Sequence, residues 1–203
     1  MKKYLSLKNI CAIAIFGALA AILYCVPGLQ FNLPFVAPGF MSIHLDDIPS
    51  LVAGLSYGPF VGCSVIVLKT LIKLPMTSTF CAGEIGDLMY SLALILPASI
   101  IYNKNRTFKN AVIGLSIGFV LNMIFSTIIN LYTIFPLYMK VYHMPEGSIA
   151  GAFKAIFNVN IKSDLDPIIS ILLIPFNLIK NVIVIAATLM IYKPLQFLIN
   201  KNK

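Results

Sequence analysis

Long apolar stretches separated by short connections make up most of the chain. Runs of this kind are typical of membrane-spanning helices, which need about 20 residues to cross the hydrocarbon core. The predicted helices lie at residues 9–26, 46–57, 59–74, 84–102, 111–138 and 167–192. Two of the six are short for a span, and Gly58-Pro59 marks a tight turn between them. The pattern predicts an all-α integral membrane protein with six transmembrane helices, in a single domain over 1–203.

One connection is itself apolar. The stretch at 29–44 contains Pro34, Pro38 and Gly39, which interrupt regular structure. Irregular backbone is not tolerated in contact with lipid hydrocarbon. We therefore expect a hydrophobic loop that lies on the outer face or dips into it.

Composition supports the membrane assignment. Of the 203 residues, 59% are apolar and 11% are charged, whereas a soluble domain carries about 25% charged residues. This is too little charge to cover a water-facing surface, and the connections leave no room for a soluble catalytic domain. No small-x-small cleavage site follows the first apolar run, so we expect that helix to be retained.

The net charge is +8, and the basic residues gather at three places. Those without an acid nearby are Lys2, Lys3, Lys8, Lys104, Arg106, Lys109, Lys193, Lys201 and Lys203. In the connection after residue 139, basic and acidic residues balance. The positive-inside rule therefore predicts that both termini and the loop near residue 105 are cytoplasmic, with an even number of spans.

Small residues in two helices have the small-xxx-small spacing that lets another helix approach closely. In the first helix the pairs are Ala14 with Ala18 and Gly17 with Ala21. On physical grounds alone, a docking face and internal packing explain these two pairs equally well. Gly114 and Gly118 repeat the spacing in the fifth helix, where we expect internal packing.

Charged side chains inside apolar segments are costly and point to function. The predicted helices carry Asp46, Asp47, Lys69, Lys73, Glu84, Asp87 and Lys180. The carboxylates open helices, so capping is an equally good explanation for them. Lys180 instead lies midway along an apolar run, with Asn177 on nearly the same face and Asn130 deep in the fifth helix. These groups need partners, either one another or a polar ligand, and we favour a ligand pocket.

The donors and acceptors of such a pocket suit a planar heterocycle with carbonyls and a ring N–H, because amides offer both and lysine donates. Aromatic residues that could pack on it are Phe31, Phe35, Phe40, Phe135, Tyr138 and Phe176. Hydroxyls and a carboxylate that could meet a polyhydroxyl tail come from Thr77, Ser78, Thr79 and Glu84.

Motifs of several other classes are absent from the sequence. It has no G-x-x-x-x-G-K-[ST] loop for ATP, no H-E-x-x-H and no G-x-S-x-G. His44 precedes Asp46 and Asp47 closely, but the other histidine, His143, lies in a different loop, so a metal site is not favoured.

A distinctive series of motifs runs along the chain. The stretches are HLDDIPSLVAGLSYGPFVG at 44–62, KTLIKLPMTST at 69–79, Gly83-Glu84, NLYTIFPLY at 130–138, Met144-Pro145 and PFNLIK at 175–180. In order and spacing they resemble the riboflavin-specific substrate-binding components (S components) of energy-coupling factor (ECF) transporters. The similarity covers nearly the whole chain from the second helix onward, and P-F-N-L-x-K is its most discriminating motif.

The resemblance implies a protein of the bacterial plasma membrane that is not an enzyme and has no cofactor of its own. It would capture riboflavin, or FMN, at the extracellular side. It would then deliver the vitamin by toppling in the membrane when docked to a transmembrane coupling (T) component and two ATPase subunits that use ATP. Six helices with cytoplasmic termini are also implied, in agreement with the charge pattern.

The resemblance also implies roles for particular residues. The flavin ring would bond Asn130, Asn177 and Lys180, and the ribityl chain would lie near Glu84 and the threonine-rich stretch before it. Ala14 and Ala18 fit the A-x-x-x-A face that docks on the T component. The chain departs from the family at Phe80-Cys81, where two glycines are frequent, and at Asp87, where Asn is usual, which leaves a modified flavin as an alternative ligand.

Three other hypotheses remain open from the sequence. One is an S component for another vitamin, since helix docking and topology would look the same. A second is a membrane enzyme acting on lipid or isoprenoid substrates, with a metal held by Asp46, Asp47, Glu84 and Asp87. A third is a proton-coupled permease that uses Lys180 and Glu84.

Overall fold

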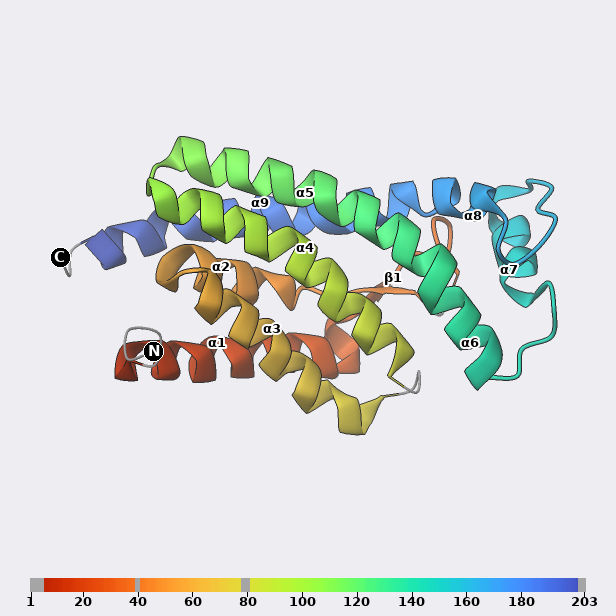
Figure 1. Cartoon of the computed structure of the whole chain (residues 1–203), viewed down its shortest axis with the longest axis horizontal. Helices are drawn as coiled ribbons and strands as arrows, with labels where there is room; N and C mark the ends of the chain where they lie inside the picture. Colours follow the sequence, from red (N-terminus) through yellow and green to blue (C-terminus); the bar gives the residue numbers. More distant parts are fainter. Residues whose placement is uncertain (1–5, 39–40, 78–80, 201–203) are drawn as a thin grey trace.

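A computed structural model describes residues 6–38, 41–77 and 81–200, with side chains as far as residue 192. It is an elongated bundle in which the long helices run roughly along the long axis (Figure 1). Its α-helices are α1 (Leu7–Cys25), α2 (Asp47–Tyr57), α3 (Pro59–Lys73), α4 (Ala82–Lys104), α5 (Phe108–Ile129), α6 (Phe135–Val141), α7 (Ser148–Phe157), α8 (Pro167–Leu172) and α9 (Ile174–Asn200). Tighter or wider turns are η1 (Pro27–Leu29), η2 (Leu74–Met76) and the π-helical η3 (Asn130–Ile134), and a two-stranded hairpin pairs β1 (Phe31–Asn32) with β2 (Ser42–Ile43).

Local sequence explains where several helices begin and end. The Ser6 side chain accepts a hydrogen bond from the backbone N–H of Asn9 and so caps α1. Gly58 has φ +107°, which favours glycine, and it ends α2 while Pro59 begins α3. The predicted tight turn at this dipeptide is therefore confirmed.

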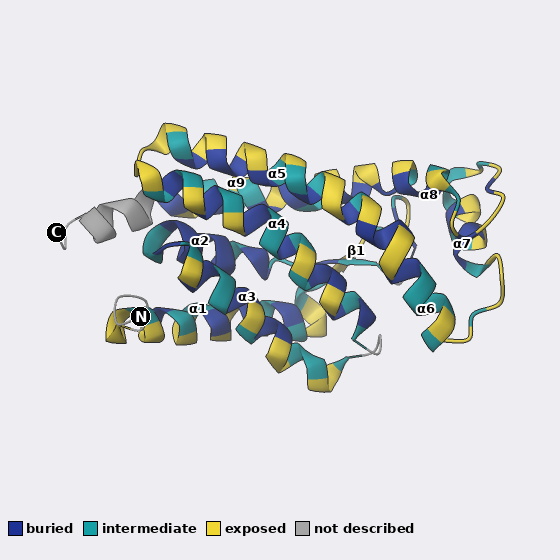
Figure 2. Cartoon of the chain, in the orientation of Figure 1, coloured by how far each residue is buried: buried dark blue, intermediate teal, exposed yellow. Residues whose placement is uncertain are grey.

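Five described helical segments are long and apolar enough to cross a membrane. They are Leu7–Cys25, Pro59–Met76, Ala82–Lys104, Phe108–Val141 and Pro167–Tyr192. The remaining predicted helix, α2, has 11 residues and a length of about 16 Å, roughly half the hydrocarbon thickness. It is buried over most of its length, in the middle of the bundle (Figure 2). The structure is thus mostly helical, as predicted, with α2 enclosed by longer helices.

One end of the bundle carries the polar connections predicted to be cytoplasmic. The start of α1, the connection between α4 and α5, and the end of α9 lie together there (Figure 1). Helix α7 and the β1–β2 hairpin lie toward the other end. Lys8 belongs to the first turn of α1, Lys104, Arg106 and Lys109 lie in or beside the α4–α5 connection, and Lys193 belongs to the last part of α9, so these basic residues share one end. Lys2, Lys3, Lys201 and Lys203 lie outside the described residues.

Close packing of α4 against α5 confirms the prediction for the glycine pair. A Cβ atom on Gly114 would lie 2.8 Å from the backbone oxygen of Ala98, and one on Gly118 would collide with the backbone of Leu94. Only glycine allows the two backbones to approach so closely.

The two small-residue pairs of α1 lie on different faces. Gly17 and Ala21 are buried, and a Cβ on Gly17 would collide with the side chain of Leu68 in α3. Ala14 and Ala18 are exposed on the outer side of the helix. The first pair is therefore used for internal packing, and of the four predicted docking residues only Ala14 and Ala18 are accessible to a partner.

Helix α7 was not predicted from the sequence. Its Ile149, Ala150 and Phe153 are buried against the ends of the neighbouring helices. The carboxylate of Asp164 accepts hydrogen bonds from the N–H groups of Gly147 (2.6 Å) and Ala150 (2.7 Å) and so satisfies donors at the start of α7. This helix has 10 residues inside a connection of balanced charge, so it lacks the long apolar run that marks a membrane-spanning helix in a sequence.

Candidate ligand pocket

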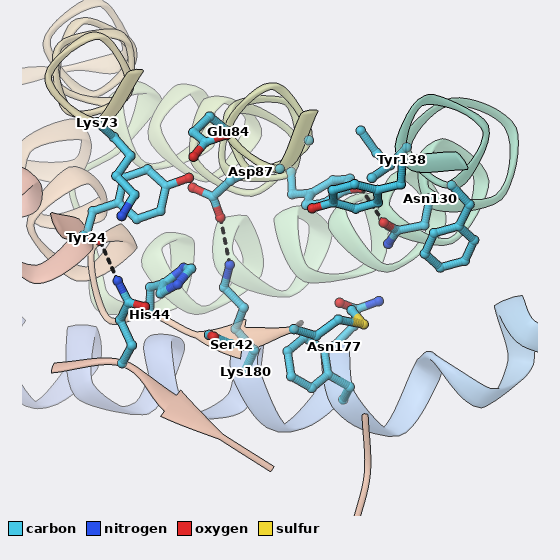
Figure 3. Close-up of a pocket in the computed structure, with 18 residues that line it drawn as sticks. Tyr24, Ser42, His44, Lys73, Glu84, Asp87, Asn130, Tyr138, Asn177 and Lys180 are labelled. Carbon is cyan, nitrogen blue, oxygen red and sulfur yellow. Dashed lines mark hydrogen bonds and ion pairs between the residues drawn. The ribbon is translucent and has the colours of Figure 1, made fainter. Parts of the chain in front are cut away.

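A cavity lies between several helices of the bundle and the β1–β2 hairpin that follows α1. Residues from α1, the hairpin, α3, α4, η3, α6 and α9 contribute to its wall (Figure 3). The lining residues are Tyr24, Gln30, Met41, Ser42, His44, Lys73, Gly83, Glu84, Gly86, Asp87, Tyr90, Asn130, Ile134, Phe135, Tyr138, Phe176, Asn177 and Lys180. The wall thus combines aromatic side chains with amides and charges, a mixture typical of small-molecule sites.

The connection after α1 covers part of this cavity. Met41, Ser42 and His44 come from β2 or its flanks, and Ser42 Oγ donates a hydrogen bond of 2.6 Å to Asn32 Oδ1 on β1. Gln30 Nε2 donates to the backbone oxygen of Tyr24 at 2.9 Å. The apolar connection predicted as a hydrophobic loop therefore folds back as a short hairpin over the site.

The structure brings the two predicted amides and the predicted lysine to one cavity, but these three side chains make no hydrogen bonds to one another in the described contacts. The Asn130 amide oxygen accepts a hydrogen bond of 2.8 Å from the Tyr90 hydroxyl. The Nδ2 atom of Asn177 is buried and has no hydrogen-bond partner among the described residues. A buried donor without a partner is costly, so Asn177 is the position where a ligand acceptor would gain most.

Asn130 is placed by an irregular turn. It opens the π-helical segment η3, which connects α5 to α6. Pro136, just after this segment, has no N–H to donate to the helix, and such a loss commonly widens or kinks a turn. Wider π turns are frequent at functional sites because they redirect one side chain out of the regular helical row.

Lys180 has a partner within the chain. Its ammonium nitrogen lies 2.9 Å from Asp87 Oδ1 and 4.0 Å from Asp47 Oδ2. In Figure 3 the Lys180 side chain rises from α9 toward Asp87 on α4. Of the two alternatives left open by the sequence, pairing within the chain therefore applies to Lys180, although its partner is Asp87 and neither of the two predicted amides.

A buried ion cluster adjoins the pocket and shares Asp87 with its wall. The ammonium of Lys69 on α3 contacts carboxylate oxygens of Asp46, Asp47 (2.8 Å) and Asp87 (3.2 Å), and it also lies 3.2 Å from Ser91 Oγ. Asp46 makes no capping hydrogen bond to α2. Ion pairing with Lys69, rather than helix capping, therefore explains the two neighbouring aspartates.

The same cluster bears on the metal hypothesis. Asp46, Asp47 and Asp87 converge closely enough to hold an ion, and within the described residues they form the one such group. Glu84, the fourth member of the predicted metal set, is not part of it. Because the ammonium of Lys69 contacts all three carboxylates, the positive charge at their centre is supplied by the protein itself.

The remaining predicted ligand residues have varied positions. Glu84 and Asp87 line the cavity, together with the predicted aromatics Phe135, Tyr138 and Phe176. Thr77 is not among the lining residues, and its Oγ1 accepts a hydrogen bond from the Cys81 N–H at 3.1 Å. Thr79, Ser78 and Phe40 lie outside the described residues, and the predicted aromatics Phe31 and Phe35 are exposed and do not line the cavity.

Several residues that line the cavity were not predicted from the sequence. Tyr24, Gln30 and Tyr90 sit at ordinary positions in or beside apolar segments, so no local pattern marks them. His44 packs edge-on against Tyr24, with ring centroids 5.0 Å apart. Burial first, and then the nearby charge of Lys180, lower the pKa of His44 from 6.5 to about 4, so its imidazole is neutral at physiological pH.

Comparison with known proteins identifies the fold and its relatives. A solved structure described as the S component of a bacterial ECF transporter superposes with a TM-score of 0.73 and 25% identity, over 94% of this chain and 96% of that one. The riboflavin transporter RibU of Staphylococcus aureus (strain TCH60) is 26% identical over 177 residues, which cover 87% of this chain and 86% of the relative. The riboflavin transporter FmnP of Bacillus subtilis (strain 168) is 23% identical over 196 residues, covering 95% and 94%. These relatives are transporters and not enzymes.

The family model for the substrate-specific component of ECF transporters matches residues 8–192, which include every described element of the bundle up to the last turns of α9. The match therefore spans the helices, the hairpin and the pocket together. This chain belongs to the family of ECF transporter substrate-specific components.

Proposed function

We propose that this chain binds riboflavin in the pocket between α4, η3 and α9 and serves as the capture subunit of an ECF-type vitamin importer. The observation that carries the proposal is the buried Nδ2 of Asn177, which has no hydrogen-bond partner among the described residues. Asn177 lies one turn before Lys180 on α9 and lines the same cavity as Asn130. An amide, a second amide and an ammonium provide both donors and acceptors, which the carbonyls and ring N–H of an isoalloxazine require. The similarity to riboflavin transporters over most of the chain supports the same ligand.

The other lining groups suit the rest of the molecule. Phe135, Tyr138 and Phe176 provide apolar surface for the tricyclic ring. Glu84, near the start of α4, is in reach of ribityl hydroxyls, and Thr77 and Thr79 belong to the connection that precedes α4. The described cavity measures about 180 Å³, below the roughly 300–1,000 Å³ of typical small-molecule sites. Ligand entry therefore requires the hairpin or neighbouring side chains to move apart.

We further infer the arrangement in the membrane. Six helices would span or enter the bilayer, with α2 enclosed by the others and both termini in the cytoplasm, as the basic residues at that end of the bundle support. The pocket, at the opposite end, would then open to the outside of a bacterial plasma membrane. Ala14 and Ala18 would dock on a T component that works with two ATPase subunits, and toppling of the chain would carry riboflavin inward.

The test is a titration of riboflavin into the purified chain in detergent, followed by quenching of flavin fluorescence. We expect saturation at one flavin per chain, and a yellow flavin retained through purification would give the same result directly. FMN titrated in parallel distinguishes riboflavin from its phosphate as the preferred ligand. A well-folded, colourless protein that quenches neither flavin would overturn the assignment and direct the search to other vitamins.

A further inference from the structure

We propose that Lys69, which does not line the pocket, is a positioning residue for ligand binding: it holds Asp87 so that Asp87 keeps the ammonium of Lys180 at the cavity wall. The inference rests on the proposed function and adds to it that Lys69 fixes the position of the Lys180 ammonium. Lys69 lies on α3, whereas Lys180 lies on α9, and Asp87 on α4 lies within 3.2 Å of both ammonium groups.

The geometry of Asp87 carries the argument. Its two carboxylate oxygens are divided between the two lysines: Oδ2 lies 3.2 Å from Lys69 Nζ, and Oδ1 lies 2.9 Å from Lys180 Nζ. A carboxylate whose two oxygens are each held by a different cation cannot rotate freely. The position of the Lys180 ammonium is therefore tied to that of Lys69, although the described ion pairs join neither lysine directly to the other.

Burial of Lys69 fixes the position of its ammonium group. Lys69 is 0% exposed and is among the largest fully buried side chains of the described structure. Its ammonium has three carboxylates and the Ser91 hydroxyl as partners, so its own bonding capacity is satisfied without any ligand. A buried cation with this many partners is held rigidly, which is what an orienting group requires.

The charge balance predicts what happens without Lys69. The cluster contains three carboxylates, from Asp46, Asp47 and Asp87, and two ammonium groups. If Lys69 is removed, Lys180 becomes the one remaining cation among the described ion pairs of these acids. Asp47 Oδ2 already lies 4.0 Å from Lys180 Nζ. The ammonium would therefore be drawn from the cavity wall toward Asp47, away from a ligand carbonyl.

A double-mutant cycle tests whether Lys69 acts through Lys180. Riboflavin dissociation constants are measured for the native chain, Lys69→Met, Lys180→Met and the double variant. We expect each single change to weaken binding by about 10- to 100-fold, the value of one charged hydrogen bond. The double variant should bind no more weakly than Lys180→Met alone. Losses that multiply in the double variant would overturn the inference.

The absorption spectrum of the bound flavin adds a readout that general destabilisation would not reproduce. A hydrogen bond from an ammonium to a ring carbonyl perturbs the flavin bands, so the spectrum of Lys69→Met should match that of Lys180→Met rather than that of the native complex. A native-like spectrum in Lys69→Met would count against repositioning. Lys109→Met, which removes an exposed lysine at the start of α5, is the matched control and should leave both affinity and spectrum unchanged.

Loss of a buried cation can also prevent folding, because three acids would be left with too few partners. The same cycle is therefore repeated in an Asp46→Asn background, where removing Lys69 leaves the net charge of the cluster at its native value. The non-additivity should persist there. If the native chain itself fails to bind riboflavin or FMN, the proposed function and this inference fall together, whereas native binding with additive losses overturns the inference alone.

Discussion

The carboxylate of Asp87 lies 2.9 Å from the ammonium of Lys180, across 93 residues of sequence. This ion pair joins α4 to α9 at the wall of the pocket, which also contains Asn177, whose buried Nδ2 has no partner in the described part of the chain. It explains how a lysine can stay charged inside an apolar helix before a ligand arrives. It also separates two kinds of polar group at the site: those already satisfied by the chain and those that still need a partner.

Replacing Asn177 by leucine should change affinity and stability in opposite directions. The buried Nδ2 donor has no partner among the described residues, and an unsatisfied buried donor costs about 1–3 kcal/mol. We expect Asn177→Leu to raise the unfolding temperature of the ligand-free protein and to weaken riboflavin binding about tenfold. Thermal unfolding and flavin titration in the same detergent measure both effects. Asn105→Leu, on an exposed connection, is the control. If Asn177→Leu lowers both the unfolding temperature and the affinity for riboflavin, the prediction is contradicted.

Enlarging Ala14 should separate ligand capture from transport. Ala14 is exposed on the outer face of α1, far along the helix from the pocket residue Tyr24. We expect Ala14→Phe to bind riboflavin like the native chain but to co-purify poorly with a T component, because close helix approach needs small side chains. Ile15→Phe, at a neighbouring exposed position that is already large, should assemble normally. Normal assembly of Ala14→Phe would remove this face from the docking model.

Substitution of Gly118 should destabilise the bundle without touching the pocket. A Cβ at this position collides with the backbone of Leu94, which cannot move like a side chain. We expect Gly118→Val to force α4 and α5 apart and to cost about 1–3 kcal/mol, in the range of overpacked interiors. Thermal unfolding of this variant is compared with that of Ser116→Ala, on the exposed face of α5. An unchanged unfolding temperature would show that the α4–α5 contact is looser than described.

His44 should make stability depend on pH in a defined window. Its pKa is lowered to about 4 in the folded chain, chiefly by burial, while an unfolded histidine titrates near 6.5. The unfolded state therefore binds the proton first, so this contribution is complete above pH 6.5 and is lost as the pH falls toward 4. The slope is at most about 1.4 kcal/mol per pH unit. His44→Gln should flatten the unfolding-temperature profile between pH 4 and 6.5, and identical profiles would contradict the assignment.

The sequence was sufficient for features that depend on local composition. A run of about 20 apolar residues can satisfy its backbone in a bilayer only as a helix, so the long helices followed from hydropathy alone. Gly58-Pro59 predicted the turn between α2 and α3, and the three-residue spacing of Asn177 and Lys180 predicted their common face. The motif resemblance also led to the correct family.

Other features depended on distant neighbours and could not be predicted. Ala14 with Ala18 and Gly17 with Ala21 have the same spacing, and only the position of α3 distinguishes the exposed pair from the buried one. The amphipathic α7 is too short to stand out in a search for spans, and the hairpin after α1 forms between strands of two residues each.

What the sequence by itself determined is therefore the class of protein, the long helices and the set of polar residues that need partners inside apolar segments. The free-energy cost of burying a polar side chain in an apolar environment depends on the residue type, so it can be read from the sequence. What only the tertiary structure decided is which of those residues are partners. Asp46, Asp47 and Asp87 looked alike as helix-opening carboxylates, yet they surround Lys69. Asp87 also pairs with Lys180 at 2.9 Å, whereas Asp47 reaches that lysine only at 4.0 Å. Ion pairing acts over a few ångströms in space, and the packing of α2, α3, α4 and α9 sets those distances.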